Sequence, residues 1–361
     1  MALLLLGSAL FADDAKVMPK MVGRFYIAPT FAFAPGEYDT DGDYHSFDDS
    51  VKVFNLGFVL EFGVIDWISA AVQWAPGWTI WSDVGGAASA KTLLGNTGST
   101  SDVNTNGVAD LFVGAKIQIV GEKAPVQTSM FRLSVAPGVI IPLPGPDFED
   151  EVKSVMKSEK ATISKMDNHV LGAGMRFYFD YIINQNFFIN LYNETIFYPV
   201  KQDLNKDGPN FYAAKGGMAQ NTTIQGMLGA ATPQIMNIDG EVNYKYRLTF
   251  EIEPVFTYPV ADGVSFSAGL PINYRYIPAY EYSFDFPAAI SGAAPNLEPL
   301  LLGYLNTDPQ HKFYINPNVS TFLTKTPLPL EFKLQYGIPL YGQNVNAQHN
   351  LTLQIRAYFK I

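Results

Sequence analysis

The chain ends with the stretch LTLQIRAYFKI (residues 351–361), in which apolar and polar side chains alternate. Every odd-numbered position from Leu351 to Ile361 is apolar, and the even-numbered positions carry polar, charged or tyrosine side chains. Consecutive side chains of a β-strand point to opposite faces, so this alternation predicts a strand with one apolar and one polar face. A tilted strand crosses a bilayer in ~9–11 residues, and this stretch is long enough to do so.

Segments of the same kind recur along the whole chain. In one of them Phe54, Leu56 and Phe58 share a face opposite Asn55 and Gly57. We count about twelve such segments, which together predict an all-β fold. They are 22–34, 51–63, 67–81, 108–120, 127–142, 169–182, 187–199, 242–258, 263–279, 312–324, 328–341 and 349–361.

The links between these segments alternate in length. Short links lie near residues 65–66, 121–125, 184–186, 260–263 and 325–327, whereas the intervening links are long: 35–50, 82–107, 143–168, 200–241 and 280–311. A membrane barrel with short periplasmic turns and long extracellular loops has this rhythm, and a soluble sandwich has no reason for it. We therefore predict a closed antiparallel transmembrane β-barrel of about twelve strands, with ~14 as the alternative. Within the loop 143–168, the spacing of Phe148, Val152 and Val155 predicts a short amphipathic helix over Phe148–Met166.

Charged side chains gather on the face that we assign to the barrel interior. A charge that faces lipid at mid-depth costs roughly 2–4 kcal/mol, whereas a charge that faces a lumen costs little. Both signs occur there, so we expect them to pair and to leave no strong ion selectivity. The lumen-lining candidates are Arg24, Glu61, Asp110, Lys116, Arg132, Arg176, Asp180, Glu194, Arg247, Glu251, Glu253, Arg275, Glu331, Lys333 and Arg356.

The composition excludes several other classes of protein. The 361 residues include no cysteine, which rules out disulfides, thiolate metal sites and a cysteine nucleophile. A formal charge of −10 disfavours a nucleic-acid partner, because binding phosphates requires surplus Lys and Arg. The mean hydropathy of +0.05 suits a barrel in which apolar and polar faces cancel.

The N-terminus reads as a secretory signal. Residues 1–12 are an apolar run that ends in small residues at Ala12, although the usual basic residues before the run are missing. We expect cleavage after Ala12 and a single barrel domain over residues 13–361. A buried N-terminal helix is the alternative.

The last eight residues, QIRAYFKI (354–361), resemble the terminal assembly signal of outer-membrane barrels. Gln354, Phe359 and Ile361 match that signal, and Arg356 stands where glycine is usual. The resemblance implies an outer-membrane location, lipid around the barrel, and recognition of the last strand by the barrel assembly machinery.

A second resemblance concerns the stretch GVADLFVGAK (107–116), followed by FRLS (131–134) and IPLPG (141–145). It is similar to barrels linked to aromatic-compound degradation and to FadL-type transporters of hydrophobic compounds. The resemblance implies movement of hydrophobic molecules through the barrel. The sequence departs from the FadL type because it lacks a substantial N-terminal segment of the kind that plugs the lumen of those barrels. Any plug is therefore expected to come from the outer loops.

Two of the predicted outer loops, 216–236 and 284–305, are unusually apolar. Exposed apolar loops of this size promote aggregation, so we expect them to fold together or to enter the lumen. Their flexible methionine side chains suit varied hydrophobic ligands. The candidate ligand-gate residues are Met218, Met227, Met236, Phe284, Phe286, Leu300 and Leu301.

These features favour a channel for passive uptake of small hydrophobic or amphipathic molecules, gated by the two apolar loops. Two alternatives stay open. One is a diffusion porin for polar solutes, and the other is a plugged surface barrel that acts as an adhesin or interaction protein.

Acidic turns offer a candidate calcium site. Asp203, Asn205 and Asp207, followed by Gly208, match the opening of a calcium-binding loop, but Ala214 stands where the bidentate Glu is expected. Asp, Asn and Gly are also common in ordinary turns. No other cofactor is expected. The four histidines form no recognisable catalytic pair in the sequence, so we predict that the chain is not an enzyme.

Overall fold

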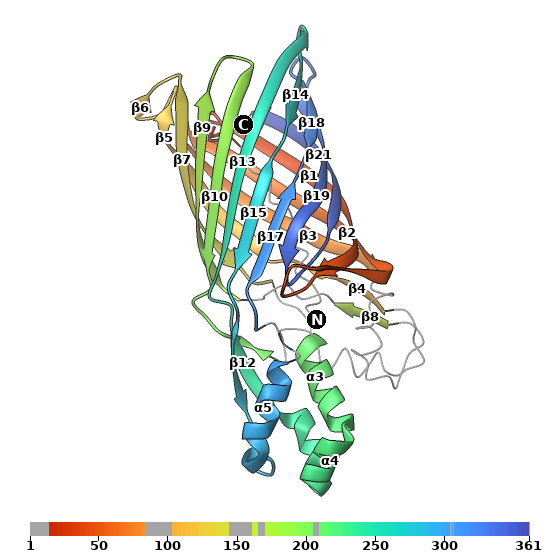
Figure 1. Cartoon of the computed structure of the whole chain (residues 1–361). Helices are drawn as coiled ribbons and strands as arrows, with labels where there is room; N and C mark the ends of the chain where they lie inside the picture. The colour runs from red at the N-terminus through yellow and green to blue at the C-terminus, as the bar shows by residue number, and fades with distance from the viewer. Residues whose placement is uncertain are drawn as a thin grey trace.

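The computed structural model describes residues 14–83, 103–143, 161–164, 170–204, 209–303, 305 and 307–360. The wall of the barrel contains twelve strand positions (Figure 1). Ten of them are single strands: β1 (Val22–Tyr38), β2 (Tyr44–Ile65), β3 (Ile68–Asp83), β5 (Leu111–Gly121), β7 (Phe131–Ile141), β9 (Gly172–Ile182), β10 (Phe187–Phe197), β13 (Tyr246–Ala261), β19 (Leu330–Gln343) and β21 (His349–Lys360).

The other two positions are each built from two strands in succession. One position is β14 (Val264–Gly269) followed by β15 (Ile272–Ile277), and the other is β17 (Gln310–Ile315) followed by β18 (Asn318–Leu323). The breaks fall at Pro271 and Pro317, and proline has no N–H to donate to a neighbouring strand. Short strands β4 (Val103–Val108), β6 (Val126–Gln127), β8 (Ala161–Ser164) and β20 (Val345–Asn346) extend the sheet.

The sheet closes on itself. Each wall strand runs antiparallel to the next, and the last strand β21 pairs with both β19 and β1. In the closing ladder Phe31 lies opposite Leu351 and Ile27 lies opposite Ile355. Closure leaves no sheet edge with unpaired backbone groups, which is the condition for β-structure in a bilayer. The predicted closed barrel of about twelve strands is confirmed.

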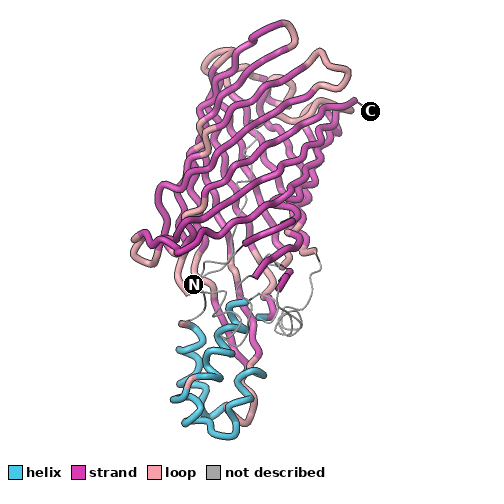
Figure 2. The backbone as a smooth tube through the Cα atoms, turned by 90° about the vertical axis from the view of Figure 1, so that its right-hand side faces the viewer, coloured by secondary structure: helices cyan, strands magenta, loops and turns pink. Residues whose placement is uncertain are grey.

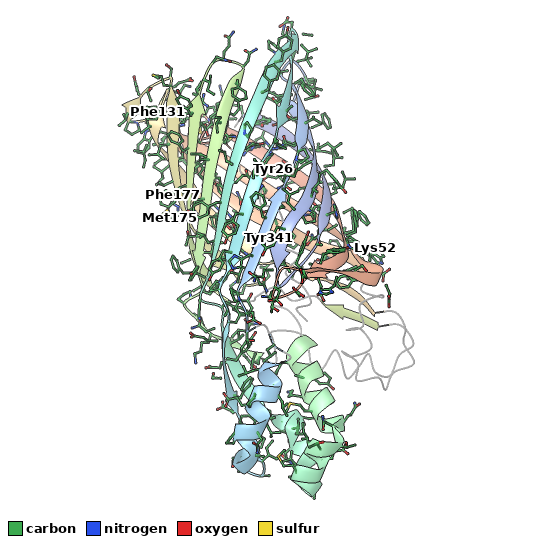
Figure 3. All side chains as sticks on the ribbon, in the orientation of Figure 1. Tyr26, Lys52, Phe131, Met175, Phe177 and Tyr341 are labelled. Atoms are coloured by element: carbon green, nitrogen blue, oxygen red, sulfur yellow. The ribbon has the colours of Figure 1, made fainter. Side chains whose placement is uncertain are left out.

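The two faces of the wall differ as the alternation predicts. On β9, Met175 and Phe177 are 37% and 46% exposed, whereas the intervening Arg176 is 3% exposed. Figure 3 shows Met175, Phe177 and Phe131 on the outside of the barrel. Lys52 of β2 is an exception to the uncharged outer face, because it shares a face with Phe54. It lies opposite Asp83, the last residue of β3.

A charge placed on the outer face at mid-strand is expected to destabilise the barrel. Phe177 lies near the middle of β9 with its ring exposed, so Phe177→Arg is expected to lower the free energy of unfolding by roughly 2–4 kcal/mol. Urea unfolding in lipid vesicles measures this. Phe177→Leu, which keeps an apolar side chain, is the control, and equal stabilities of the two variants would show that this face does not meet hydrocarbon.

The long connections at one end of the barrel form a compact module, here called the cap (Figure 2). Its helices project beyond the barrel end, away from the lumen (Figure 1). None of the helices in the described part of the chain is long and apolar enough to span a membrane. The cap consists of β11 (Gln202–Asp203), α3 (Pro209–Gln220), α4 (Thr222–Leu228), η2 (Gly229–Asn237), β12 (Asp239–Asn243), β16 (Glu281–Asp285), η3 (Ser291–Ala293) and α5 (Ala294–Leu302).

Two local predictions need correction. The loop predicted over residues 35–50 is mostly a hairpin, because β1 and β2 remain paired as far as Tyr38 and Tyr44. The helix predicted over Phe148–Met166 is wrong for residues 161–164, which form β8 and pair in parallel with β4. Pairing with β4 satisfies backbone groups that an isolated helical turn leaves open. Residues 144–160 and 165–169 lie outside the described part.

Candidate functional site

The polar side chains of the wall strands meet inside the barrel. Arg176 Nη1 of β9 donates to Gln73 Oε1 of β3 at 2.7 Å. These strands are not neighbours in the sheet, because β5 and β7 lie between them. The contact therefore passes through the interior, over the inner faces of β5 and β7.

Most of the predicted lumen-lining charges are paired. Arg24 and Glu61, opposite each other on β1 and β2, are 2.6 Å apart. Similar pairs join neighbouring or nearby strands, and in a low-dielectric interior such pairs need hydrogen bonds to offset desolvation. They are Arg356 with Glu331 at 3.4 Å, Arg132 with Asp180 at 3.3 Å, and Lys333 with Glu253 at 4.0 Å.

A second group of charges is centred on Glu194 of β10. Its Oε2 accepts from Arg176 Nε at 2.7 Å and its Oε1 accepts from Arg247 Nη2 at 3.3 Å. The Arg176 guanidinium also lies 3.6 Å from the centre of the Phe112 ring. That ring occupies the space beside Gly138, where an added Cβ would lie 2.2 Å from the ring. Glycine is therefore required at position 138 for the ring to support Arg176.

The remaining lumen candidates also lie on the inward faces. Glu251 of β13 is buried, and Lys116 of β5 and Arg275 of β15 are half-buried. Asp110, just before β5, is half-buried as well. Their role in solute passage stays a prediction, because burial and pairing establish only their position.

The N-terminal segment, residues 14–19, enters the lumen, which the sequence analysis did not foresee. The Ala15 N–H donates to Asp180 Oδ1 at 2.8 Å, and the Ala15 carbonyl accepts from Gln118 Nε2 at 3.0 Å and from the Ser134 hydroxyl at 2.5 Å. Ala15 is completely buried. The interpretation that only outer loops could fill the lumen is wrong, because chain preceding the first strand fills part of it.

The segment enters where β2 provides room for it. An added Cβ at Gly63 would lie 2.0 Å from the Pro19 carbonyl oxygen, so only glycine permits this backbone path. The polar residues that bind the segment lie on β5, β7 and β9, and no local sequence signal shows that they contact the same stretch of backbone.

At the other end of the barrel, the cap is packed onto the wall through one apolar cluster. Phe112, Ile140 and Ile196 of the wall belong to the same cluster as Met218 and Leu301 of the cap. Of the candidate gate residues, Met218 and Leu301 are buried in this cluster, and Phe284 and Phe286 pack against it. Met236 is half-buried, and Met227 and Leu300 are exposed. The two apolar loops thus fold together outside the barrel rather than entering the lumen.

A cavity of about 350 Å³ lies between the cap and the barrel rim. Its wall is mixed, with apolar groups such as Leu302, Leu305 and Val345 beside the carboxylates of Glu37 and Asp308. A cavity of this size and lining fits a small amphipathic molecule. Its full set of described lining residues is Glu37, Tyr38, Asp39, Thr40, Leu302, Gly303, Leu305, Thr307, Asp308, Asn344, Val345 and Asn346.

The outer end of the β1–β2 hairpin, beyond the predicted membrane segments, holds an exposed ion pair. His45 Nε2 lies 2.8 Å from Asp39 Oδ2. The hydrogen bond raises the pKa of His45 above its ordinary value and lowers the pKa of Asp39. Both side chains face water, so the pair contributes little to stability.

The calcium hypothesis stays a prediction. Asp203 lies in β11 opposite Glu241 of β12, while Asn205 and Asp207 lie outside the described residues. Among the residues that the structure describes, no three His, Asp or Glu side chains gather as they would around a metal ion.

Comparison with solved structures finds the same architecture in an outer-membrane channel. The COG4313 outer membrane channel from Pseudomonas putida F1 has a TM-score of 0.59 at 13% identity, with 97% of this chain and 100% of that chain covered. The P. putida toluene transporter TodX has a TM-score of 0.40 at 10% identity, with coverage of 95% and 91%. A FadL homologue from Pseudomonas aeruginosa has a TM-score of 0.33 at 7% identity, with coverage of 94% and 90%.

At these identities the likeness concerns the fold, and the first of these structures carries it. The chain therefore has the fold of an outer-membrane β-barrel. Neither the models of known protein families nor the curated proteins give a match to the sequence.

Proposed function

We propose that the chain is a passive outer-membrane channel for small hydrophobic or amphipathic molecules, with the cap controlling entry. The observation that carries the proposal is the cavity of about 350 Å³ between the cap and the barrel rim, whose lining is partly apolar and partly charged. Ligand cavities of this kind combine apolar surface with a few polar groups that orient the ligand. The fold shared with an outer-membrane channel supports the same conclusion.

In this proposal the cap faces the outside of the cell and the short turns face the periplasm. The uncharged outer face meets lipid, and the last strand β21 serves as the segment that the barrel assembly machinery recognises. A molecule enters under the cap, and the N-terminal segment and the paired charges narrow its path. The ion pairs inside the lumen hold that path polar without giving it a large net field.

Reconstitution tests the proposal against its two alternatives. A lipopolysaccharide outer leaflet slows the entry of apolar solutes into vesicles. The expected result is that the protein accelerates the entry of toluene. Faster swelling in arabinose without toluene entry would instead favour a polar-solute porin. An absence of both, together with silent planar bilayers, would favour a plugged surface barrel.

Loosening the cap tests its control of entry. Leu301 is completely buried in the cluster that packs the cap onto the barrel. Leu301→Asp places an unpaired carboxylate there and is expected to raise toluene entry about twofold or more, because a buried charge without a partner disrupts packing. Leu300→Asp, at an exposed position of the same helix, is the matched control. Equal entry rates for the two variants would contradict control by the cap.

A further inference from the structure

Two cations inside the lumen lack the partners that the other lumenal charges have. Arg275 of β15 lies directly opposite Lys312 of β17, in adjacent strands of the wall (Figure 1). Side chains at opposed positions of antiparallel strands lie close together, and like charges there repel each other. The arrangement is therefore unfavourable unless something else compensates it.

In the described part of the wall, no carboxylate lies directly opposite either cation, and the nearest acidic position on the same inward face is the diagonal neighbour Glu251 of β13. The residue opposite Arg275 on its other side is Thr249 of β13, and the residue opposite Lys312 on its other side is Gly342 of β19. Among the described residues, no Asp or Glu oxygen lies within 4.0 Å of either cation. The Nε and Nη2 atoms of Arg275 are buried and have no hydrogen-bond partner.

Arg275 and Lys312 also line a small cavity. Its volume is about 30 Å³, and it is lined by Arg275 and Lys312 together with the amide side chains of Gln310, Asn344 and Asn346. By this measure one water needs roughly 10–15 Å³, so the space suits a carboxylate group. A guanidinium matches a carboxylate with two parallel hydrogen bonds, and the Lys312 ammonium supplies a further donor.

The small cavity adjoins the larger one under the cap. Both are lined by residues 344–346, which include the short strand β20. A molecule with an acidic head and an apolar body could thus place its head between the two cations and its body beside Tyr38 and Val345. The acidic residues of the outer cavity, Glu37 and Asp308, repel the head from the rim.

We propose that Arg275 and Lys312 bind the carboxylate of a small organic acid inside the lumen. The inference rests on the proposed channel function, since it names the substrate class of the same path. The bound carboxylate supplies a negative charge beside two cations that have no carboxylate directly opposite them in the wall.

Calorimetric titration of the detergent-solubilised full chain with benzoate tests the site. Benzoate is expected to bind, and benzamide, which has the same ring and no charge, is expected not to. Arg275→Gln and Lys312→Gln are each expected to weaken benzoate binding about tenfold or more, because each removes a charge-assisted hydrogen bond. Lys333→Gln removes a lumenal cation that is paired with Glu253, and it is expected to leave binding unchanged.

A second measurement guards against misfolding. Without ligand, Lys312→Gln removes the repulsion between Lys312 and Arg275, so it is expected to raise the urea midpoint of unfolding. Added benzoate is expected to raise the midpoint of the unmodified chain and to leave the midpoints of the Arg275 and Lys312 variants unchanged. Benzoate binding that is absent, or equal in all variants, would overturn the site. If planar bilayers show no conductance but benzoate still binds, the channel function is refuted and the binding site is supported. If the bilayers conduct but benzoate does not bind, the site is refuted and the channel function is supported.

Discussion

Replacing Glu194 with alanine is expected to lower the free energy of unfolding by about 3–5 kcal/mol, because it leaves the buried Arg176 and the half-buried Arg247 without their shared carboxylate. Glu194 is 1% exposed and accepts hydrogen bonds from both Arg176 and Arg247. The Tyr192 hydroxyl, which donates to the same carboxylate at 3.1 Å, also loses its acceptor. Urea unfolding in lipid vesicles measures the change.

The control for this variant is Glu122→Ala. Glu122 is also paired with an arginine, Arg132, at 3.4 Å, but its side chain is 64% exposed. Water screens such a pair, so its loss is expected to cost about 1 kcal/mol or less. Similar losses for the two variants would show that Glu194 does not hold a buried cluster together.

Removing the N-terminal segment is expected to open the lumen. A barrel of about twelve strands has room for a narrow passage when nothing fills it, so deletion of Asp14–Val17 is expected to raise single-channel conductance about twofold or more. The deletion frees Asp180, Gln118 and Ser134, which now bind the backbone of Ala15. Planar-bilayer recording measures the effect.

Lys16→Ala provides the control for the deletion. The Lys16 side chain is 54% exposed and forms an ion pair with its neighbour Asp14, at 3.7 Å. Its removal leaves the backbone contacts of Ala15 in place, so conductance is expected to stay at the level of the full chain. A deletion variant that conducts no better than Lys16→Ala would mean that the segment does not obstruct the path.

Residues 351–361 illustrate what could be predicted without a structure. The alternation of the stretch predicted the strand and its two faces, and β21 extends from His349 to Lys360 with Gln354 and Arg356 buried. Local alternation is a reliable signal because side-chain direction in a strand depends only on position along it. The charged residues of the lumen were found by the same rule.

The partners of those charges could not be predicted. Arg176 contacts Gln73, which is 103 positions away in the chain and on a strand that is not a neighbour. Ala15 contacts Ser134, 119 positions away. Contacts of this kind depend on barrel closure and on the height of each residue in the wall, and a period of two carries no information about either.

For the cap, too, the sequence predicted one feature and left another open. Its apolar content indicated that residues 216–236 and 284–305 pack against something, and Met218 and Leu301 are indeed buried together. Composition did not say whether these loops enter the lumen or cover its mouth. The tertiary structure shows that they fold together outside the barrel and pack onto wall residues such as Phe112 and Ile140.

The amino-acid sequence alone determined the closed barrel, the approximate number of its strands and the face that most of their side chains take, because these follow from local alternation and chain length. Only the tertiary structure decided which lumenal charges are neutralised. Arg24 faces Glu61 in the register, whereas Arg275 faces Lys312. The register between consecutive wall strands sets these pairings, and local alternation carries no information about that register.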